Sequence, residues 1–348
     1  METNGYIFPT TTVHANFEDA KKLYLDAGAL PYIDSEKQVT ISAISEGRRS
    51  VIIGEPGVGK SELLVHLKKH LDQQATTTEL VSLRETDAID RIDSFVNTKT
   101  TSRALLLDGL DEVRSSVFPT VLQKIETISR LYPDISIFIS ARWVFVSRYA
   151  NSFRNYRFVT IWPFSMDRVR QYLSHSGRSK SDIDTLINRF MSFGHQTLVL
   201  QIPRYLTYLN EFLRARGIEA ATRVSRNDLF EYFIYSKLEL EERKFYANKR
   251  PIIKRVLEKL ALSMEIYQTN VISLDELMTF FDDLHSDLKL VALSQVKLET
   301  LFQYSLLKNN VDSVEFENTE FQEYLAAKEI GRLADPTRAA FDFAVDQR

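Results

Sequence analysis

The residues with the clearest chemistry stand at positions 54–61, where three glycines precede a lysine and a serine. The run reads Gly54-Glu55-Pro56-Gly57-Val58-Gly59-Lys60-Ser61. Glycines at this spacing let successive backbone N–H groups point inward around a phosphate, and a helix that begins here adds the positive end of its dipole. Lys60 is expected to neutralise the terminal phosphates of a nucleotide, and the Ser61 hydroxyl to bind Mg²⁺. A glycine-rich turn without a ligand is the weaker alternative, because a strand pattern precedes the run and a helix pattern follows it.

A second group of candidates is the acidic cluster that follows the apolar run at 105–107. It consists of Asp108, Asp111 and Glu112, with Gly109 directly after the first acid. A carboxylate at a strand tip beside a phosphate loop can hold Mg²⁺ through water, which is the role expected of Asp108. Asp111 or Glu112 would then polarise the attacking water. A solvated turn would also explain two extra acids, but the pairing with a phosphate loop favours a catalytic cluster.

Short aliphatic runs predict the strands that position both groups. Their nearly continuous apolarity is typical of strands buried on both faces, so this stretch predicts a parallel sheet covered by helices. After Ser165 the apolar period is helical almost everywhere. The predicted strands are 50–53, 80–83, 104–107, 135–139 and 158–161.

The C-terminal third shows helix starts and one hairpin. Residues 306–316 are typical of a hairpin that turns at Asn309-Asn310. Helices followed by a hairpin and a further helix indicate a winged-helix arrangement. Three helix starts are predicted from capping-box spacing, namely Ser225 with Asp228, Ser273 with Glu276, and Thr319 with Gln322.

The string Leu-Leu-Leu-Asp-Gly-Leu-Asp-Glu at 105–112 resembles the signature of the NACHT family of signal-transduction ATPases. Other elements follow in the family's order from about residue 48 onward. Residues 138–142 resemble the sensor strand, whose Arg142 would reach the γ-phosphate. Residues 202–206 resemble the helical-domain segment whose proline, here Pro203, would pack near the adenine. Residues 316–327 are similar to the closing helix of the family's winged-helix domain.

The chain departs from this resemblance at Asn318. Family members commonly place a histidine there, which holds the ADP β-phosphate in the resting state. Asparagine can donate a hydrogen bond but never a charge-assisted one. The alternative is that Asn318 only helps to start the helix that follows.

Together these patterns predict an α/β fold: a three-layer P-loop NTPase domain with a parallel sheet, then a small helical domain and a winged-helix domain. The family usually continues into a C-terminal ligand-sensing array, so the resemblance implies that such a sensor region is absent from this chain. The expected parts are an N-terminal helical segment and linker at 1–46, the P-loop NTPase (NACHT) domain at 47–164, the helical domain at 165–222, the winged helix at 223–333, and the start of a C-terminal extension at 334–348.

Composition narrows the classes of function. The 348 residues include 44 Lys+Arg, 47 Asp+Glu and no cysteine, which excludes disulfides, Cys-ligated zinc and a thiol nucleophile. No apolar run is long enough for a membrane helix and no signal peptide is recognisable, so a cytoplasmic protein without a membrane partner is expected. A net charge of −3 argues against wholesale coating by nucleic acid but permits a local basic face.

Two further patterns have competing interpretations. His66 and His70 have the spacing of metal ligands on a helix, but packing or solvation is the better explanation because no His-Glu-x-x-His motif is present. The stretch from 142 to 170 contains six arginines but a single acid, Asp167. They predict either a solvated face with ion pairs, or an interface to an acidic patch of the next protomer or to a nucleic acid.

The function predicted first is a signalling switch that binds ATP or ADP with Mg²⁺, hydrolyses ATP slowly and forms homo-oligomers on activation. The resemblance implies a role in innate immunity or antiphage defence. The alternative is an AAA-like motor or loader ATPase that acts on nucleic acid or protein, which Gly109 disfavours because such motors usually place a catalytic glutamate there. A third possibility is a nucleotide-binding scaffold without hydrolysis. Nucleic acid is a possible partner that the sequence does not specifically indicate.

Overall fold

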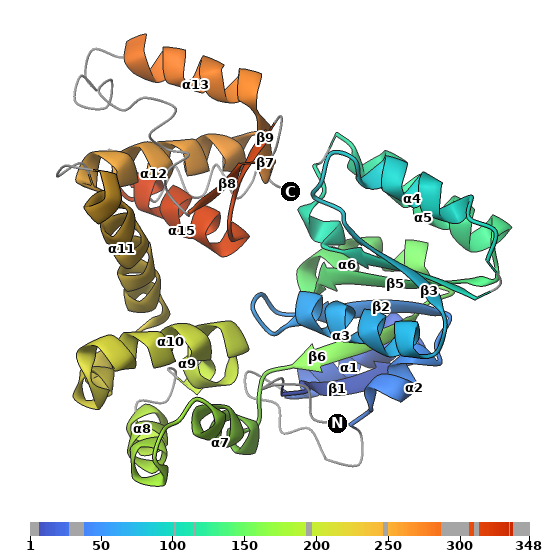
Figure 1. Cartoon of the computed structure of the whole chain (residues 1–348), viewed down its shortest axis with the longest axis horizontal. Coiled ribbons are helices and arrows are strands. Elements are labelled where there is room, and N and C mark those ends of the chain that lie inside the picture. Colours follow the sequence, from blue (N-terminus) through green and yellow to red (C-terminus); the bar gives the residue numbers. More distant parts are fainter. Residues whose placement is uncertain are drawn as a thin grey trace. The chain divides into compact units, whose positions relative to one another are not determined.

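The computed structural model describes residues 7–27, 38–100, 102–114, 116–192, 197–245, 250–286, 306–309, 313–333 and 335–336. The chain divides into two compact units (Figure 1). Unit 1 comprises Met1–Val113 and Val117–Leu229, and unit 2 comprises Arg114–Ser116 and Phe230–Arg348.

Unit 1 is built around a six-stranded sheet of order β1-β6-β2-β5-β4-β3 (Figure 1). All neighbouring strands pair in parallel except β1, which pairs antiparallel with β6. The five predicted strands and the mostly parallel sheet are therefore confirmed. The strands are β1 (Thr10–His14), β2 (Arg49–Gly54), β3 (Thr77–Ser82), β4 (Arg103–Asp108), β5 (Ile135–Arg142) and β6 (Arg157–Trp162).

Strand β1 corrects the expectation that residues 1–46 hold only helix and linker. Its sequence, Thr-Thr-Thr-Val-His, contains no apolar run, yet its three threonines are buried. Two of their hydroxyls form hydrogen bonds: Trp162 Nε1 donates to Thr12 Oγ1 at 2.9 Å, and Thr11 Oγ1 donates to the Val39 carbonyl at 3.1 Å. These bonds offset part of the cost of burying polar side chains, although the buried Thr10 hydroxyl has no partner among the described residues.

Helices cover both faces of the sheet. Val51 and Ile53 of β2 join a core with α1, α4, α5 and α6, whereas Ile52 points to the other face, which α3 covers. This is the expected three-layer arrangement. The helices are α1 (Phe17–Ala27), α2 (Ile41–Ser45), α3 (Lys60–Gln73), α4 (Ala88–Val96), α5 (Phe118–Leu131) and α6 (Trp143–Tyr149), with short 3-10 turns η2 (Leu110–Glu112) and η3 (Ala150–Phe153).

Unit 1 continues after the sheet with a group of helices that pack on one another. The Tyr172 hydroxyl lies 2.9 Å from the Thr207 hydroxyl, and Arg178 Nε donates to Asn210 Oδ1 at 2.9 Å. The elements are α7 (Met166–His175), α8 (Lys180–Ser192), α9 (Thr197–Gln201), α10 (Pro203–Arg216) and the 3-10 helix η4 (Ile218–Arg223).

Unit 2 combines helices with a three-stranded antiparallel sheet of order β7-β9-β8. The two strands of the predicted hairpin are confirmed; its turn at 310–312 lies outside the described residues. The third strand was not expected, because three residues are too few to show a period. That this unit is a winged helix stays a prediction. Its elements are α11 (Arg226–Phe245), which begins in unit 1, α12 (Arg250–Ile266), β7 (Val271–Ser273), α13 (Leu274–Ser286), β8 (Leu307–Asn309), β9 (Ser313–Phe316) and α15 (Thr319–Ile330).

Two of the three predicted capping boxes form. Ser225 and Asp228 exchange backbone-to-side-chain hydrogen bonds at 2.8 and 3.2 Å, and Ser273 and Glu276 do so at 2.7 and 3.2 Å. The third prediction is wrong in position, because Asn318 caps α15 and Thr319 is already helical.

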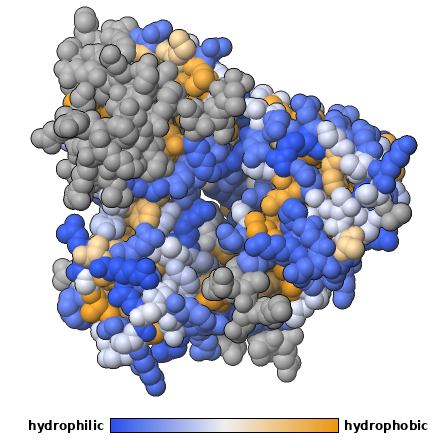
Figure 2. Space-filling model, viewed as in Figure 1, coloured by the Kyte–Doolittle hydropathy of each residue, from blue (hydrophilic) through white to orange (hydrophobic). Residues whose placement is uncertain are grey.

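Among the described residues no helix is both long and apolar enough to cross a bilayer. Hydrophilic residues cover most of the coloured surface in the view of Figure 2.

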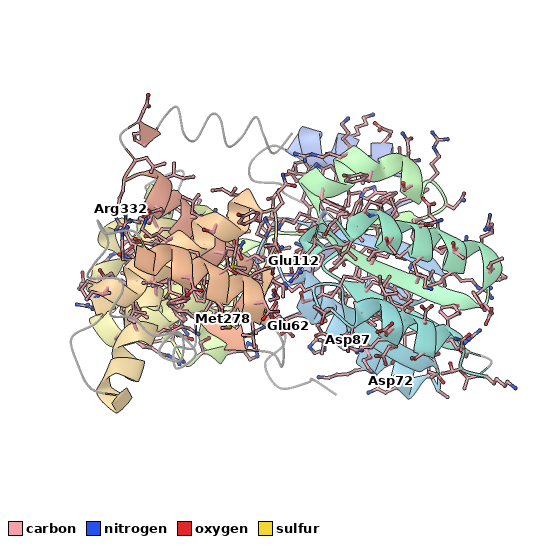
Figure 3. All side chains as sticks on the ribbon, turned by 90° about the horizontal axis from the view of Figure 1, so that it is seen from above. Glu62, Asp72, Asp87, Glu112, Met278 and Arg332 are labelled. Carbon is pink, nitrogen blue, oxygen red and sulfur yellow. The ribbon has the colours of Figure 1, made fainter. Side chains whose placement is uncertain are left out.

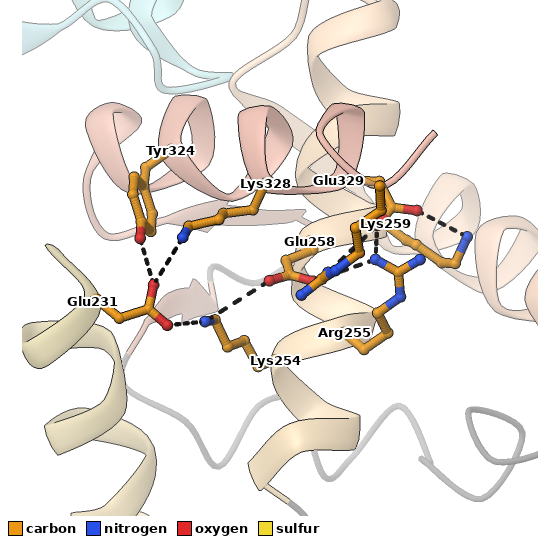
Figure 4. A network of polar contacts seen from close by, with 9 residues as sticks. Glu231, Lys254, Arg255, Glu258, Lys259, Tyr324, Lys328 and Glu329 are labelled. Atoms are coloured by element: carbon orange, nitrogen blue, oxygen red, sulfur yellow. Dashed lines mark hydrogen bonds and ion pairs between the residues drawn. The ribbon is translucent and has the colours of Figure 1, made fainter. Parts of the chain in front are cut away.

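Helices α11, α12 and α15 share an ion-pair network (Figure 4). Its centre is Glu258, whose side chain is 0% exposed and pairs with Arg332, with Arg255 at 3.5 Å and with Lys254 at 3.9 Å. The other members are Glu231, Lys259, Lys328, Glu329 and the Tyr324 hydroxyl. Removing one partner of a buried ion pair lowers the free energy of unfolding strongly. The packing of unit 2 is therefore expected to depend on Glu258.

We expect Glu258→Ala to lower the free energy of unfolding of unit 2 by about 2 to 4 kcal/mol, since it removes a buried carboxylate that Lys254, Arg255 and Arg332 share and leaves a cavity in its place. The measurement is urea unfolding followed by circular dichroism. Glu219→Ala is the control, because Glu219 pairs with Arg189 but is 81% exposed. That change should cost at most about 1 kcal/mol. Equal costs for the two variants would show that the network does not hold the helices together.

Candidate functional site

The phosphate-loop residues lie where β2 ends and α3 begins. Gly57 and Gly59 have φ angles of 76° and 103°, in the left-handed region that favours glycine. Lys60 Nζ donates hydrogen bonds to the carbonyls of Gly54, at 2.9 Å, and Glu55, at 3.1 Å. The Lys60 side chain therefore reaches back to the first residues of the loop, and this is the side chain expected to meet phosphate.

The first turn of α10 lies against this loop. The backbone N–H of Arg204 donates to the Gly57 carbonyl at 3.3 Å. A Cβ added to Gly57 would lie 3.1 Å from side-chain atoms of both Ile202 and Arg204. The structure therefore places Pro203, between these two residues, beside the loop, while its contact with adenine stays a prediction.

The N-terminal helix also reaches the loop through a residue that the sequence did not single out. Tyr24 of α1 stacks on Trp143, with ring centroids 4.3 Å apart, and its hydroxyl donates to the Glu55 carboxylate. Burial, with the Glu55 contact, raises the pKa of Tyr24. An isolated tyrosine on a predicted helix gives no signal of such a contact.

Asp108 lies at the carboxyl end of β4 and is held by its neighbour strand. Ser140 of β5 donates its hydroxyl to Asp108 Oδ1 and accepts the backbone N–H of Gly109 at 2.8 Å. Ser140 is 1% exposed, so this hydroxyl fixes the carboxylate from inside the sheet. Ser140 was not predicted from the sequence, although a polar residue within an otherwise apolar central strand was the available signal.

Asp111 and Arg142 form a pair. Asp111 Oδ1 accepts the backbone N–H of Arg142 at 2.9 Å, and Asp111 Oδ2 lies 3.0 Å from Arg142 Nε. The Asp111 side chain is only 6% exposed. With both oxygens engaged, Asp111 is placed to orient Arg142.

Glu112 is held by a different arginine. Its carboxylate is 2.6 Å from Arg84 Nε, and Oε2 would lie 3.1 Å from a Cβ added to Gly109. Gly109 itself has a φ of 79°. Burial raises the pKa of Glu112, and Arg84 opposes this effect. Arg84, just beyond β3, is a second residue that the sequence analysis missed.

Lys60 of the loop interacts electrostatically with these acids. Burial lowers the pKa of Lys60, and the charges of Asp111, Glu112 and Asp108 act against that shift. In Figure 3, Glu62 and Asp72 mark the first and last turns of α3, and Glu112 is labelled toward the Glu62 end. The lysine and the acid cluster are thus parts of one site.

The donor set fits a nucleotide phosphate with Mg²⁺. Mg²⁺ commonly takes one or two carboxylates, a hydroxyl and the substrate's own phosphates. Asp108 and the exposed Ser61 can supply the protein ligands. Among the described residues no three His, Cys, Asp or Glu side chains form a metal-binding group, so a cage made by the protein alone is not found there. His70 instead lies 3.2 Å from the Gln74 amide.

Asn318 belongs to unit 2, where its side chain caps α15. Its Oδ1 accepts the backbone N–H of Glu320 at 2.9 Å, and the residue is 9% exposed. This matches the alternative in which Asn318 starts the helix. Contact with an ADP β-phosphate stays a prediction.

Residues 49–140 match the family profile described as the AAA domain (dynein-related subfamily). No match was found among curated protein sequences. The matched residues contain the phosphate loop, Asp108, Asp111 and Glu112, and they form an AAA-type P-loop ATPase domain. The domain hydrolyses ATP and uses ATP or ADP with Mg²⁺.

Three solved structures illustrate the range of structural neighbours. The Walker-type ATPase PABY2304 of Pyrococcus abyssi is 13% identical, with a TM-score of 0.38 and coverage of 86% of this chain and 99% of that one. The Aeropyrum pernix ORC1 protein in complex with DNA is 12% identical, with a TM-score of 0.40 and coverage of 83% and 91%. The Thermotoga maritima RuvB Holliday junction branch migration motor is 12% identical, with a TM-score of 0.36 and coverage of 88% and 93%.

A glycine substitution tests the packing of the loop against α10. We expect Gly57→Ala to weaken ATP binding at least tenfold, because the new methyl group strains a positive φ and presses on residues 202 and 204. The measurement is a titration with fluorescent ATP. Gly177→Ala is the matched control, since Gly177 also has a positive φ of 83° but no atom within 4 Å of the added Cβ. Equal ATP affinity in the two variants would contradict the packing argument.

Proposed function

We propose that this chain is an AAA-type ATPase that cycles through ATP binding, hydrolysis and release to act on a macromolecular partner, nucleic acid or protein. The proposal is supported by the family match at 49–140 and by the grouping of Lys60, Asp108, Glu112 and Arg142 around one loop. Oligomerisation is part of this proposal.

The observation that carries the proposal is the position of the Glu112 carboxylate. Gly109 disfavoured a continuously working ATPase, because no acid directly follows Asp108. In the structure, however, Glu112 Oε2 lies 3.1 Å from the point where a side chain at 109 would begin. The 3-10 turn at 110–112 brings that carboxylate back over the glycine. An acid close in space thus replaces one that is missing in sequence.

Each charged group then has a distinct task. Glu112 accepts the proton of the attacking water, and its raised pKa makes it a better base than a fully solvated carboxylate. Lys60 and Arg142 stabilise the negative charge of the transferring phosphoryl group. Asp111 orients Arg142, and Ser140 orients Asp108. Bound Mg²⁺ would supply further charge neutralisation between the phosphates.

A NACHT-like switch in defence signalling is the second candidate. It is favoured by the succession Asp108, Gly109, Asp111 and Glu112 and by the order of the later segments. Such a switch would retain ADP and assemble only after exchange for ATP.

Nucleotide content separates these two functions. Protein purified without added nucleotide should carry far less than one ADP per chain if it releases product freely. The measurement is chromatography of the acid-extracted nucleotide. Stoichiometric ADP that survives dialysis would contradict the cycling ATPase and support the switch.

A further inference from the structure

A basic hollow of about 800 Å³ opens at the end of the unit 1 sheet that is remote from the phosphate loop. It is bordered by the starts of β2 and β6 and by the end of β1, whereas the loop follows the end of β2. A strand of six residues spans about 20 Å, so the two sites are separate. The basic hollow is lined by Val13, His14, Ala15, Arg48, Arg49, Pro133, Arg154, Asn155, Tyr156 and Arg157.

The charge of the basic hollow is unbalanced. Four lining residues are arginines, none is acidic, and no ion pair joins these arginines to any carboxylate within the described parts of the chain. Glu46 acts on Arg157 only through electrostatics. Asp134 interacts with Arg48 in the same way, but it is ion-paired with Arg103 at 2.7 Å. Four arginines that outnumber the acids near them favour an anionic ligand.

The arginines are held in place by neutral oxygens. Arg48 Nη1 donates to the Pro133 carbonyl at 3.2 Å, and Arg49 donates to the Ser129 carbonyl. Each of these bonds uses one of the five N–H donors of a guanidinium group, so the others can bind a ligand. Arg154 is likewise oriented by Asn151 Oδ1 at 3.0 Å. This preorganisation reduces the entropy lost when an anion binds.

The basic surface is larger than a single small anion needs. A second hollow of about 530 Å³ adjoins the first and shares Arg49, Pro133, Asn155 and Tyr156 with it. It adds Arg130, with Glu126 as the one acid in its lining. Arg154 and Arg157 belong to the arginine-rich stretch of the sequence. Of the other arginines in that stretch, Arg142 pairs with Asp111 and Arg170 with Asp184.

We infer that the basic hollow binds the phosphate backbone of a nucleic acid without reading its sequence. Half of its lining residues are exposed, which suits a long polyanion better than a small ligand that a pocket must enclose. Tyr156 is 4% exposed and its hydroxyl is bound to Ser129, so its ring is not a platform for base stacking. Contacts are therefore to phosphates, which fix position without specificity. The inference names the partner of the ATPase proposed above and depends on that function only for its biological role.

The test is fluorescence anisotropy with a labelled 30-nucleotide single strand and the corresponding duplex, using the full chain. The double variant Arg48→Glu/Arg154→Glu reverses two exposed charges whose hydrogen bonds are few. We expect it to bind DNA at least tenfold more weakly, with the slope of log K against log salt reduced by about two. The control Lys69→Glu/Arg216→Glu makes the same change of charge at exposed positions outside the hollow and should bind almost as the wild type does. Thermal melting checks that both variants are folded.

Each result has a defined meaning. Equal DNA binding by the wild type and the hollow variant overturns the inference. An absence of DNA binding by the wild type also overturns the inference. Binding of tripolyphosphate or polyglutamate to the hollow would not change that result. The tripolyphosphate titration is made in the Lys60→Ala background, to remove the ATP site. DNA binding that persists in Lys60→Ala shows that the hollow acts separately, so a failure of the ATPase proposal would not be mistaken for a failure of this one.

Discussion

Lys60→Ala is expected to abolish ATP and ADP binding while the fold is kept. Within the described parts of the chain, Lys60 Nζ donates hydrogen bonds to two loop carbonyls and packs in no apolar core, and alanine suits the first turn of a helix. The variant should therefore lose the stabilisation that ligand supplies, about 3 to 4 kcal/mol at 100 to 1,000 times Kd. Its unfolding free energy without nucleotide should change by no more than about 1 kcal/mol.

The measurement is the melting temperature with and without ATP and Mg²⁺. Lys69→Ala is the control, because Lys69 is exposed and lies more than two helical turns after Lys60 on the same helix. ATP should raise the melting temperature of the wild type and of this control, but not that of Lys60→Ala. An equal rise in all three proteins would show that the nucleotide binds elsewhere.

Glu112→Gln is expected to slow ATP cleavage by 10²- to 10⁴-fold, the range typical of losing a general base, with ATP affinity nearly unchanged. The amide keeps the shape of the carboxylate beside Gly109 but cannot accept a proton. Asp111→Asn should also slow cleavage, but by a smaller factor, because it loosens Arg142 without removing it. Asp108→Ala should instead weaken Mg²⁺-dependent binding.

Single-turnover cleavage of radiolabelled ATP, with excess protein, distinguishes these roles. The control is Glu219→Gln, an exposed residue far along the chain from the loop. Cleavage by Glu112→Gln at the rate of the wild type would rule out this carboxylate as the base. A larger loss in Asp111→Asn than in Glu112→Gln would exchange the two assignments.

The sequence predicted the buried strands well because parallel strands with helices on both faces need continuous apolar runs. It failed at β1, where threonine side chains are buried through hydrogen bonds to Trp162 and Val39. No periodic pattern marks such a strand. The predicted N-cap at Thr319 was wrong by one residue, because asparagine is the better N-cap and Asn318 takes that place. The Gln322 amide does not complete a capping box but donates to Glu265 at 2.9 Å.

The sequence predicted the loop and the acids as a candidate site but not the residues that hold them in place. The loop and the acids carry local motifs, so residue types and spacing were enough to single them out. Ser140, Arg84 and Tyr24 come from other elements and become visible only when strand order places them beside the motif. The separate tasks of Asp111 and Glu112 likewise depend on which partner each carboxylate meets, and the sequence left that choice open.

Steady-state release of phosphate from ATP by the purified full chain tests the central claim most directly. The account predicts many turnovers per chain, dependent on Mg²⁺, absent in Lys60→Ala and strongly reduced in Glu112→Gln. Release of a single phosphate per chain, followed by arrest with ADP bound, would contradict a cycling ATPase.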